Sequence, residues 1–344
     1  MDMTIDADPG YLRLHRRGDL ARRAEAAVAR LADCDLCPQA CHVDRTAGDA
    51  GALAAGAVCR TGRHARVASV GPGFAEERVV VGDAGSGDVV FAWCNMRCVY
   101  CENADASMRG KGDVLDARAL ADAMLDLQRA GCPTINLVGP SHVVAQILEA
   151  LVLAAEDGLS LPLVYNSGGY DSVDTLRLLD GVVDIYTPDA KYADDMAARR
   201  CSRVRDYGTV NRAAIAEMIR QVGPLRLDPD TGLARRGVLL RHLVLPDDMG
   251  GVRPVLELAR ALGGPGMTVA ILDSYHPAHQ ADRVPGLAAP ADPALVAEAR
   301  ALARALDLEV VDLGSADEAG PRESRAGPNR GAPSPSVSAL PSVG

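Results

Sequence analysis

Residues 89–103 read VVFAWCNMRCVYCEN, an apolar run that leads directly into three cysteines, Cys94, Cys98 and Cys101. The apolar run has the composition of a buried strand, and the Cys-x3-Cys-x2-Cys spacing lets one short loop fold three thiolates around a single inorganic cluster. A cubane iron–sulfur cluster has four irons, so three cysteines leave one iron free to bind another molecule, as the open position of a catalytic metal site does. The loop therefore predicts chemistry rather than electron storage alone.

A zinc knuckle, or three buried thiols that happen to lie close together, could also produce a cysteine-rich loop. Zinc sites usually have paired Cys-x2-Cys arms, and unliganded buried cysteines rarely gather in one loop. An iron–sulfur cluster therefore fits the spacing better than either alternative.

The composition indicates a globular protein. With 344 residues and 48% hydrophobic content, the chain can bury a full core. The net charge of -10 argues against a general nucleic-acid or anionic-membrane surface, and an aromatic content of 3% argues against stacking platforms for single strands. No apolar run reaches the ~18 to 20 residues of a membrane helix, and the N-terminus has no basic-then-apolar signal. We therefore expect a cytoplasmic protein with no membrane or nucleic-acid partner.

A second group of cysteines precedes the loop and consists of Cys34, Cys37, Cys41 and Cys59. Four thiolates can close a tetrahedral zinc site or saturate an iron–sulfur cluster, and the spacing alone does not separate the two. Reduced structural thiols or a redox pair are the alternatives.

Cys132 and Cys201 complete the nine cysteines of the chain. Each is isolated from the other cysteines in the sequence. We expect each to be a packed or incidental thiol.

Apolar runs alternate with helical stretches from residue 85 onward. Strands are expected near residues 88–93, 133–138, 162–166, 182–187, 238–244 and 267–272. Residues 116–131 and 142–156 have the apolar periodicity of helices. Strands joined by helices need crossover connections and so form a parallel sheet. The predicted fold class is α/β, with a partial, three-quarter parallel barrel of six βα units rather than a closed barrel of eight.

Three domains are expected along the chain. Residues 1–84 form an N-terminal extension that contains an amphipathic helix over 11–32 and the first cysteine group. Residues 85–313 form the barrel. Residues 314–344 are rich in Ser, Pro, Ala and Gly without aromatics, which predicts a disordered tail.

Polar residues follow the third and fourth predicted strands, at the carboxyl ends where parallel sheets bind ligands. Asn166 and Ser167 offer an amide and a hydroxyl suited to a ribose or a carboxylate. Asp189 and Lys191 follow the next strand; a helix cap or a loop charge is the alternative for the aspartate.

Two further candidates each have two possible roles. Ser141 follows the second strand, where it either contacts a ligand or caps the next helix. His242 lies within the fifth apolar run, where it either contacts a ligand or is a hydrogen-bonded core histidine.

The cysteine loop, with Tyr100 just before its third cysteine, resembles the signature of the radical S-adenosylmethionine (radical SAM) enzymes. Five further segments extend the resemblance to one branch, the pyruvate formate-lyase-activating-enzyme-like proteins. These segments are Cys-x2-Cys-Pro at 34–38, Gly-Ser-Gly at 85–87, Tyr-Asn-Ser-Gly-Gly-Tyr at 165–170, Pro-Asp-Ala-Lys at 188–191 and Arg-His-Leu-Val-Leu-Pro at 241–246. The resemblance covers roughly residues 30–280.

The resemblance implies a 4Fe-4S cluster on the three cysteines of the loop, with S-adenosylmethionine chelated by the open iron. One electron would cleave the sulfonium to a 5′-deoxyadenosyl radical that abstracts hydrogen from a substrate. The segment from Gly139 to Ser141 resembles the part of these enzymes that binds the amino group of the cofactor, without its acid. Asp189 and Lys191 would lie beside the cofactor, and His242 would contact its ribose or carboxylate.

The leading hypothesis is a radical SAM enzyme. Its implied partners are a reductase or a flavodoxin or ferredoxin as electron donor, and a protein substrate such as a glycyl-radical enzyme; a small-molecule substrate is the other possibility. The sequence does not assign a catalytic residue beyond the cofactor sites. The competing hypothesis is a non-catalytic metal-binding or redox-sensing protein in which both cysteine groups are structural.

Overall fold

The computed structural model describes residues 8–311. The predicted tail, residues 314–344, lies outside this described part of the chain.

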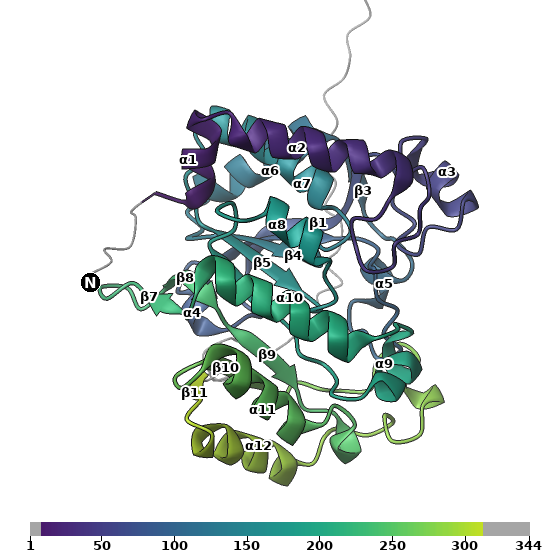
Figure 1. Ribbon diagram of the computed structural model, residues 1–344, viewed down its shortest axis with the longest axis vertical. Helices are drawn as coiled ribbons and strands as arrows, with labels where there is room; N and C mark the ends of the chain where they lie inside the picture. The colour runs from purple at the N-terminus through teal and green to yellow at the C-terminus, as the bar shows by residue number, and fades with distance from the viewer. Residues whose placement is uncertain (1–7, 312–344) are drawn as a thin grey trace, which may run out of the picture. The chain divides into compact units, whose positions relative to one another are not determined.

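The described residues form an α/β fold around a mostly parallel sheet (Figure 1). The larger sheet has the order β3-β1-β2-β4-β5-β6-β8-β7, and a smaller one has the order β11-β10-β9. The strands are β1 (Ala65–Gly73), β2 (Ser86–Phe91), β3 (Asp113–Leu115), β4 (Ile135–Val138), β5 (Leu163–Ser167), β6 (Ile185–Pro188), β7 (Arg226–Leu227), β8 (Ala234–Val238), β9 (Leu240–Leu243), β10 (Thr268–Leu272) and β11 (Glu309–Val311).

The helices are α1 (Gly10–Arg16), α2 (Asp19–Ala29), α3 (Gly48–Ala54), α4 (Arg78–Val81), α5 (Ala104–Ser107), α6 (Ala117–Arg129), α7 (Val144–Glu156), α8 (Val173–Leu178), α9 (Asp195–Ser202), α10 (Tyr207–Val222), α11 (Val252–Gly263) and α12 (Pro293–Ala305), with 3-10 turns η1 (Arg30–Asp33), η2 (Pro246–Asp248) and η3 (Ala281–Arg283). The helical periodicity over residues 116–131 and 142–156 corresponds to two of the helices, α6 and α7.

Six parallel strands, β2, β4, β5, β6, β9 and β10, correspond to the six predicted from the sequence. The strand predicted near residues 238–244 is divided between two sheets. Strand β8 pairs with β6, whereas β9, which begins two residues after β8 ends, pairs with β10. An isolated parallel bridge between Asp189, just after β6, and Arg241 of β9 links the two sheets. The two sheets are thus joined into one curved arrangement, and the α/β partial barrel is confirmed.

One local prediction is wrong. The single helix expected over 11–32 is two helices, α1 and α2, separated at Gly18. Gly18 has φ of 72°, a left-handed conformation that stops a right-handed helix.

The outer face of the sheet packs against helices. Asp116 caps α6 by accepting a hydrogen bond from the backbone N–H of Ala119 at 2.9 Å.

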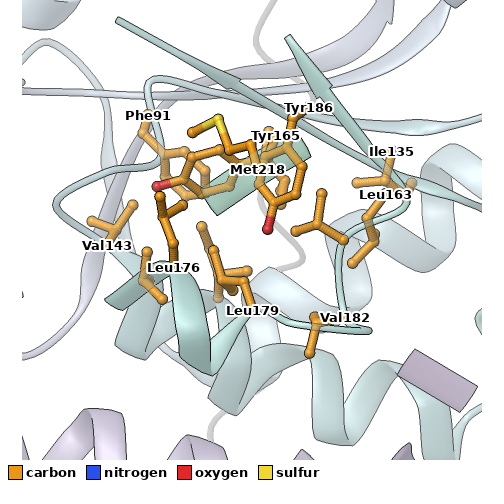
Figure 2. Packing of buried hydrophobic residues seen from close by; sticks show 14 of the residues in the cluster. Phe91, Ile135, Val143, Leu163, Tyr165, Leu176, Leu179, Val182, Tyr186 and Met218 are labelled. Atoms are coloured by element: carbon orange, nitrogen blue, oxygen red, sulfur yellow. The ribbon is translucent and has the colours of Figure 1, made fainter. Parts of the chain in front are cut away.

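Helices α2, α6 and α7 pack side by side over one part of the sheet (Figure 1). Figure 2 shows Tyr165 of β5 and Tyr186 of β6 among apolar side chains that include Leu176 of α8 and Met218 of α10. The two tyrosine rings meet edge to face, with centroids 5.6 Å apart.

The opposite face of the strands has two layers of side chains. Val164, Ile185, Leu239 and Ala270 form a buried apolar layer together with Val80 of α4. Because side chains alternate along a strand, Asn166 and Arg241 lie on the same face two residues beyond Val164 and Leu239, and Asp189 lies there four residues beyond Ile185. The short helix α4 therefore closes the floor of the barrel beneath a polar layer.

Candidate functional site

The three-cysteine loop begins at the carboxyl end of β2. Trp93 has φ of 63°, and its backbone N–H donates to the carbonyl of Ala106 at 2.9 Å, which turns the chain out of the strand. The Cys94 Sγ accepts the backbone N–H of Met96 at 3.3 Å. The Cys98 Sγ lies 3.0 Å from the Ser202 hydroxyl. In the same way, the Sγ of Cys101 lies 3.1 Å from the hydroxyl of Ser107.

These thiols have the donor chemistry that a thiolate-bound cluster requires. Burial, followed by the neighbouring Cys98 thiol, raises the pKa of Cys94 to about 12. Burial raises the pKa of Cys98 to about 11, against the opposing effect of the Lys191 ammonium. Metal ions favour deprotonated sulfur, and N–H and O–H donors around sulfur stabilise it. Among residues 8–311, no three His, Cys, Asp or Glu side chains are already placed to share one metal ion.

A chain of hydroxyl groups runs away from the loop. The Tyr100 and Tyr192 hydroxyls lie 2.6 Å apart, and the Tyr192 hydroxyl lies 2.6 Å from that of Ser202. Ser202 in turn contacts the Cys98 thiol. The two tyrosines therefore fix the orientation of the hydroxyl that reaches this sulfur.

A buried charge network lies beside the loop. Both oxygens of the Asp189 carboxylate are bound, one by Lys191 Nζ at 2.5 Å and the other by Arg241 Nε at 3.1 Å. Burial opposes ionisation of Asp189, but the positive charges of Lys191 and Arg241 outweigh it and lower its pKa. The aspartate is therefore held as a carboxylate, and the helix-cap and loop-charge alternatives do not describe it.

The other side of Arg241 faces Asn166 and Glu76. Its Nη2 donates to Asn166 Oδ1 at 2.8 Å, and its Nη1 forms an ion pair with Glu76. The Asn166 amide nitrogen donates to the second oxygen of Glu76 at 2.9 Å. Strand ends β5, β6 and β9 thus share one hydrogen-bonded group with a residue from the segment before α4.

Sequence reasoning missed Glu76, Glu77 and the central role of Arg241. Glu76 and Glu77 lie between an unpredicted strand, β1, and α4, where two adjacent glutamates have no local feature that distinguishes them from a surface loop. Arg241 precedes His242 in β9. Because successive side chains of a strand point to opposite faces, only one of the two could point into the barrel, and the pattern alone does not say which.

Glu77 is a buried carboxyl group with one oxygen, Oε2, that has no hydrogen-bond partner. Burial raises its pKa to about 7 from an ordinary value of 4.5, while the nearby Arg241 charge opposes the shift. Near neutral pH, the group is thus poised between its protonated and ionised forms.

Replacing Glu77 with glutamine is expected to stabilise the fold at alkaline pH by roughly 2–3 kcal/mol and to change little at acid pH. The unfolded carboxyl group ionises near pH 4.5 and the folded one near pH 7, so wild-type stability falls as pH rises between these values. The amide imitates the protonated form and avoids this loss. Thermal unfolding of the two proteins from about pH 5 to about pH 8 measures the difference.

The exposed Glu25 provides the matched control, because Glu25→Gln makes the same exchange on the surface and should change stability by no more than about 0.5 kcal/mol. A Glu77→Gln protein that is less stable than wild type above pH 7 would contradict the conclusion that Glu77 is buried with a raised pKa.

The predicted residues of β5 are divided between its two faces. Asn166 points into the polar layer, whereas Ser167 donates to Asp171 Oδ2 at 2.7 Å, on the face that carries Tyr165. Tyr165 donates to the other oxygen of Asp171 at 2.9 Å. Ser141 lies close enough to this carboxylate to oppose the rise in its pKa that burial causes. Ser167 and Ser141 therefore support the strand ends from behind.

Ser141 does not cap the next helix, since the N-cap of α7 is Val143 and no side chain bonds there. Gly139 has φ of 70°, and a Cβ at its position would meet nothing within 4 Å. The backbone at Gly139 is thus open to close approach by another molecule.

His242 lies behind the charge network. Its Nδ1 is 2.7 Å from the carbonyl of Ala190, and its Nε2 has no partner. Burial lowers its pKa, so the ring is neutral. A Cβ added to Gly250 would lie 3.0 Å from the imidazole, which shows how closely this glycine packs on the ring.

The first cysteine group is folded into a tight loop. The Cys34 N–H donates to the carbonyl of Val43, and its own carbonyl accepts from His42, both at 3.0 Å. Burial raises the pKa of Cys37, and the neighbouring Cys59, Cys34 and Cys41 thiols raise it further. The four cysteines predicted as a possible second site therefore lie near enough to influence one another, although no three of them are placed to share one metal ion.

The two remaining cysteines belong to neither group, although the carbonyl of Cys201 accepts a hydrogen bond from the backbone N–H of Val99 in the three-cysteine loop at 2.8 Å. Cys132 and Cys201 are buried, and the Cys201 Sγ lies 3.3 Å from the Sδ of Met249. Their surroundings agree with the packed thiols expected from the sequence.

The three-cysteine loop thus lies at the carboxyl end of the first parallel strand of an α/β partial barrel. Residues 89–224 match the Radical SAM superfamily. This match supports a radical SAM domain in that part of the chain.

Individual relatives cover part of the chain. It is 28% identical over 182 residues to "Uncharacterized protein MJ0674" of Methanocaldococcus jannaschii, a span that covers 51% of this chain and 48% of that protein. The chain thus spans about half the length of the curated relative it matches.

Two solved structures are similar at low identity. TYW1 with a lysine-pyruvate adduct matches at 11% identity with a TM-score of 0.33, over 50% of this chain and 60% of that one. The radical S-adenosylmethionine methyltransferase TsrM from Kitasatospora setae, with tryptophan and a SAM analog bound, matches at 14% identity with a TM-score of 0.38, over 55% and 36%.

Within the described residues, the helices are too short or too polar to cross a bilayer.

Proposed function

We propose that this chain is a radical SAM enzyme that cleaves S-adenosylmethionine reductively and abstracts hydrogen from a substrate in the barrel. The observation that carries the proposal is the Cys94, Cys98 and Cys101 loop at the carboxyl end of β2, within the matched domain and beside a buried charge network. When bound, the cluster would supply one electron to the sulfonium of S-adenosylmethionine, and cleavage of that sulfonium would supply the 5′-deoxyadenosyl radical.

The residues of the chain bind and orient. Cys94, Cys98 and Cys101 hold the cluster, and the Lys191 ammonium lies close enough to affect the Cys98 thiol. Asn166 and Asp189 belong to the same network as Lys191, which supports their assignment to ligand contact. These groups are preorganised and largely excluded from water, so they need little rearrangement to orient a charged ligand.

The other candidates take positioning roles in this proposal. Ser141 and Ser167 orient the strand ends through Asp171, and His242 orients the segment around Ala190. Gly139 leaves its backbone accessible to the cofactor.

Activation of a glycyl-radical enzyme is the finer form of the proposal, in which the substrate is the backbone of a partner protein. It is supported by Asp189 and Lys191, which stand beside the cysteine loop as the resemblance implies. If the hydrogen comes from a glycine of that partner, formation of 5′-deoxyadenosine should depend on the partner's presence. If no glycyl-radical protein stimulates formation of 5′-deoxyadenosine, a small-molecule substrate becomes the remaining possibility.

Anaerobically reconstituted and reduced wild-type protein is expected to convert S-adenosylmethionine to 5′-deoxyadenosine, whereas Cys98→Ala should give none. The reason is that two cysteines cannot hold the cluster in place of three. Chromatography of the quenched reaction measures the product.

Cys132→Ala is the matched control, since it removes a buried thiol away from the loop and should leave product formation intact. If wild-type protein with its full cluster makes no product under any reductant, the non-catalytic metal-binding or redox-sensing alternative replaces this proposal.

A further inference from the structure

We propose that Cys34, Cys37, Cys41 and Cys59 hold a second iron–sulfur cluster, with Arg45 as its buried charge partner, and that this cluster passes electrons to the first. The electron path rests on the function proposed above. The metal site does not.

Arg45 is the feature that points to an anionic group among these cysteines. Its side chain is 1% exposed, although a guanidinium remains charged at any physiological pH. Its nitrogens donate to the carbonyls of Thr61 at 2.7 Å, His142 at 2.8 Å and Gly62 at 3.5 Å, and to Cys34 Sγ at 3.4 Å. In the described part of the chain it makes no ion pair with a carboxylate.

A buried cation without an anion is costly, because carbonyl dipoles do not replace a counter-charge. The groups near Arg45 that could carry negative charge are sulfur atoms, with Cys59 and Cys34 contributing most strongly. Four thiolates on a metal centre carry net negative charge, whereas four protonated thiols carry none. A metal-bound set of cysteines therefore completes the environment of Arg45.

Position favours an iron–sulfur cluster over zinc. Gln39, which lies between Cys37 and Cys41, donates through Nε2 to the carbonyl of Asn95 at 2.7 Å. Asn95 follows Cys94 directly. One hydrogen bond thus connects a residue inside the first cysteine group to a residue inside the second.

Two further contacts join the same loops. Arg97, next to Cys98, donates through Nη1 to the carbonyl of Val58, next to Cys59, at 3.2 Å. The Arg60 guanidinium, on the other side of Cys59, lies over the Trp93 ring, 5.2 Å from its centroid. Structural zinc does not exchange electrons, whereas two redox clusters must lie close to each other to do so, as the loops that these contacts join do.

The electron balance is one electron per step. A low-potential, one-electron protein donor of the flavodoxin or ferredoxin class reduces the second cluster by one electron and is itself oxidised by one. The second cluster then reduces the first by one electron and returns to its oxidised state. Cys41 is the partly exposed member of its group, which gives the donor a side from which to approach.

Metal analysis of three anaerobically reconstituted proteins tests the site. Wild type should contain about eight irons per chain, and about four should remain both in Cys37→Ser/Cys59→Ser and in Cys94→Ser/Cys98→Ser/Cys101→Ser. The triple variant should also show the electron paramagnetic resonance signal of a reduced cluster. A triple variant that retains zinc instead of iron, or no metal, overturns the proposal.

Arg45 is tested through the midpoint potential of the second cluster in the triple-variant background. Removing a nearby positive charge makes reduction harder, so Arg45→Met should lower the potential, and Arg45→Lys, which keeps the charge, should lower it less. Equal shifts in both variants would mean that Arg45 only fills space.

The path is tested by comparing reductants in the 5′-deoxyadenosine assay. Cys37→Ser/Cys59→Ser should retain product formation with dithionite, which can reduce the first cluster directly, but lose roughly tenfold or more with a reduced flavodoxin. Equal loss with both reductants, or no loss with either, overturns the path. Absence of product from wild type under both reductants would instead overturn the proposed function, while iron content still decides the site.

Discussion

Replacing Asp189 with alanine is expected to lower the free energy of unfolding by about 3–5 kcal/mol. The carboxylate neutralises Lys191 and Arg241 at once, and the three side chains are only 13%, 15% and 12% exposed. Its removal leaves two cations in a water-poor interior with one remaining carboxylate, Glu76, to pair with Arg241. Chemical denaturation of wild type and variant under anaerobic conditions measures the loss.

The pH dependence of this loss has a defined sign. The folded pKa of Asp189 is lowered below its ordinary value of 3.8, so the carboxylate stabilises the fold above that value and ceases to do so as pH falls through the folded pKa. The difference between wild type and Asp189→Ala should therefore be constant near neutral pH and shrink under acid conditions.

Asp174→Ala is the matched control, because it removes an exposed aspartate paired with Arg177 on the surface. Exposed pairs contribute little, so the change should stay within about 0.5 kcal/mol. A similar loss in both variants would show that the network around Asp189 contributes no more than a surface pair. Combining Asp189→Ala with Arg241→Met should cost less than the sum of the single changes, since each removes a partner of the other.

Gly169→Ala is expected to prevent stable folding, or to cost more than about 4 kcal/mol. Gly169 has φ of 69°, and a Cβ there would lie 2.0 Å from the backbone oxygen of Asp189 and 2.3 Å from the amide nitrogen of Asn211. That nitrogen donates to the carbonyls of both Gly169 and Asp189 at 2.9 Å, so no side-chain movement relieves the clash without breaking these bonds. Yield of soluble protein and thermal unfolding measure the effect.

Gly131→Ala separates the clash from the backbone conformation. Gly131 also has positive φ, 85°, at the end of α6, but a Cβ there meets nothing within 4 Å. The expected cost is only about 1–2 kcal/mol, the strain of the left-handed conformation. If the two variants were equally stable, the close approach of Gly169 to Asp189 would not be the constraint that it is argued to be.

The elements that the sequence predicted well have strong local patterns. The six parallel strands are apolar runs bounded by Gly, Pro or Asp, and α6 and α7 show clear helical periodicity. The cysteine loop is equally local, because its three ligands lie within eight residues. Such signals do not depend on knowing which distant segment packs against them.

Other features depend on tertiary context. Strand β1 contains Gly71, Pro72 and Gly73, which disfavour strands, and it forms by antiparallel pairing with β2. The polar layer likewise joins Glu76 to Asn166 and Arg241, which are 90 and 165 residues away. A spacing rule cannot connect side chains at such separations. The sequence nevertheless indicated Asn166, Asp189 and Lys191, because they follow strands whose carboxyl ends meet at one edge.

Helix α4 has a consequence for the autonomy of the barrel. Val80 completes the apolar floor, and Glu76 supplies a counter-charge to Arg241. Both residues nevertheless precede residue 85, the predicted start of the barrel, and the first parallel strand, β2, begins at the next residue. A truncated chain that started there would expose Val164, Ile185 and Leu239 to water and leave Arg241 with one fewer anion. The barrel is therefore not a portable module, and grafting it onto another protein would require its preceding segment to be transferred with it.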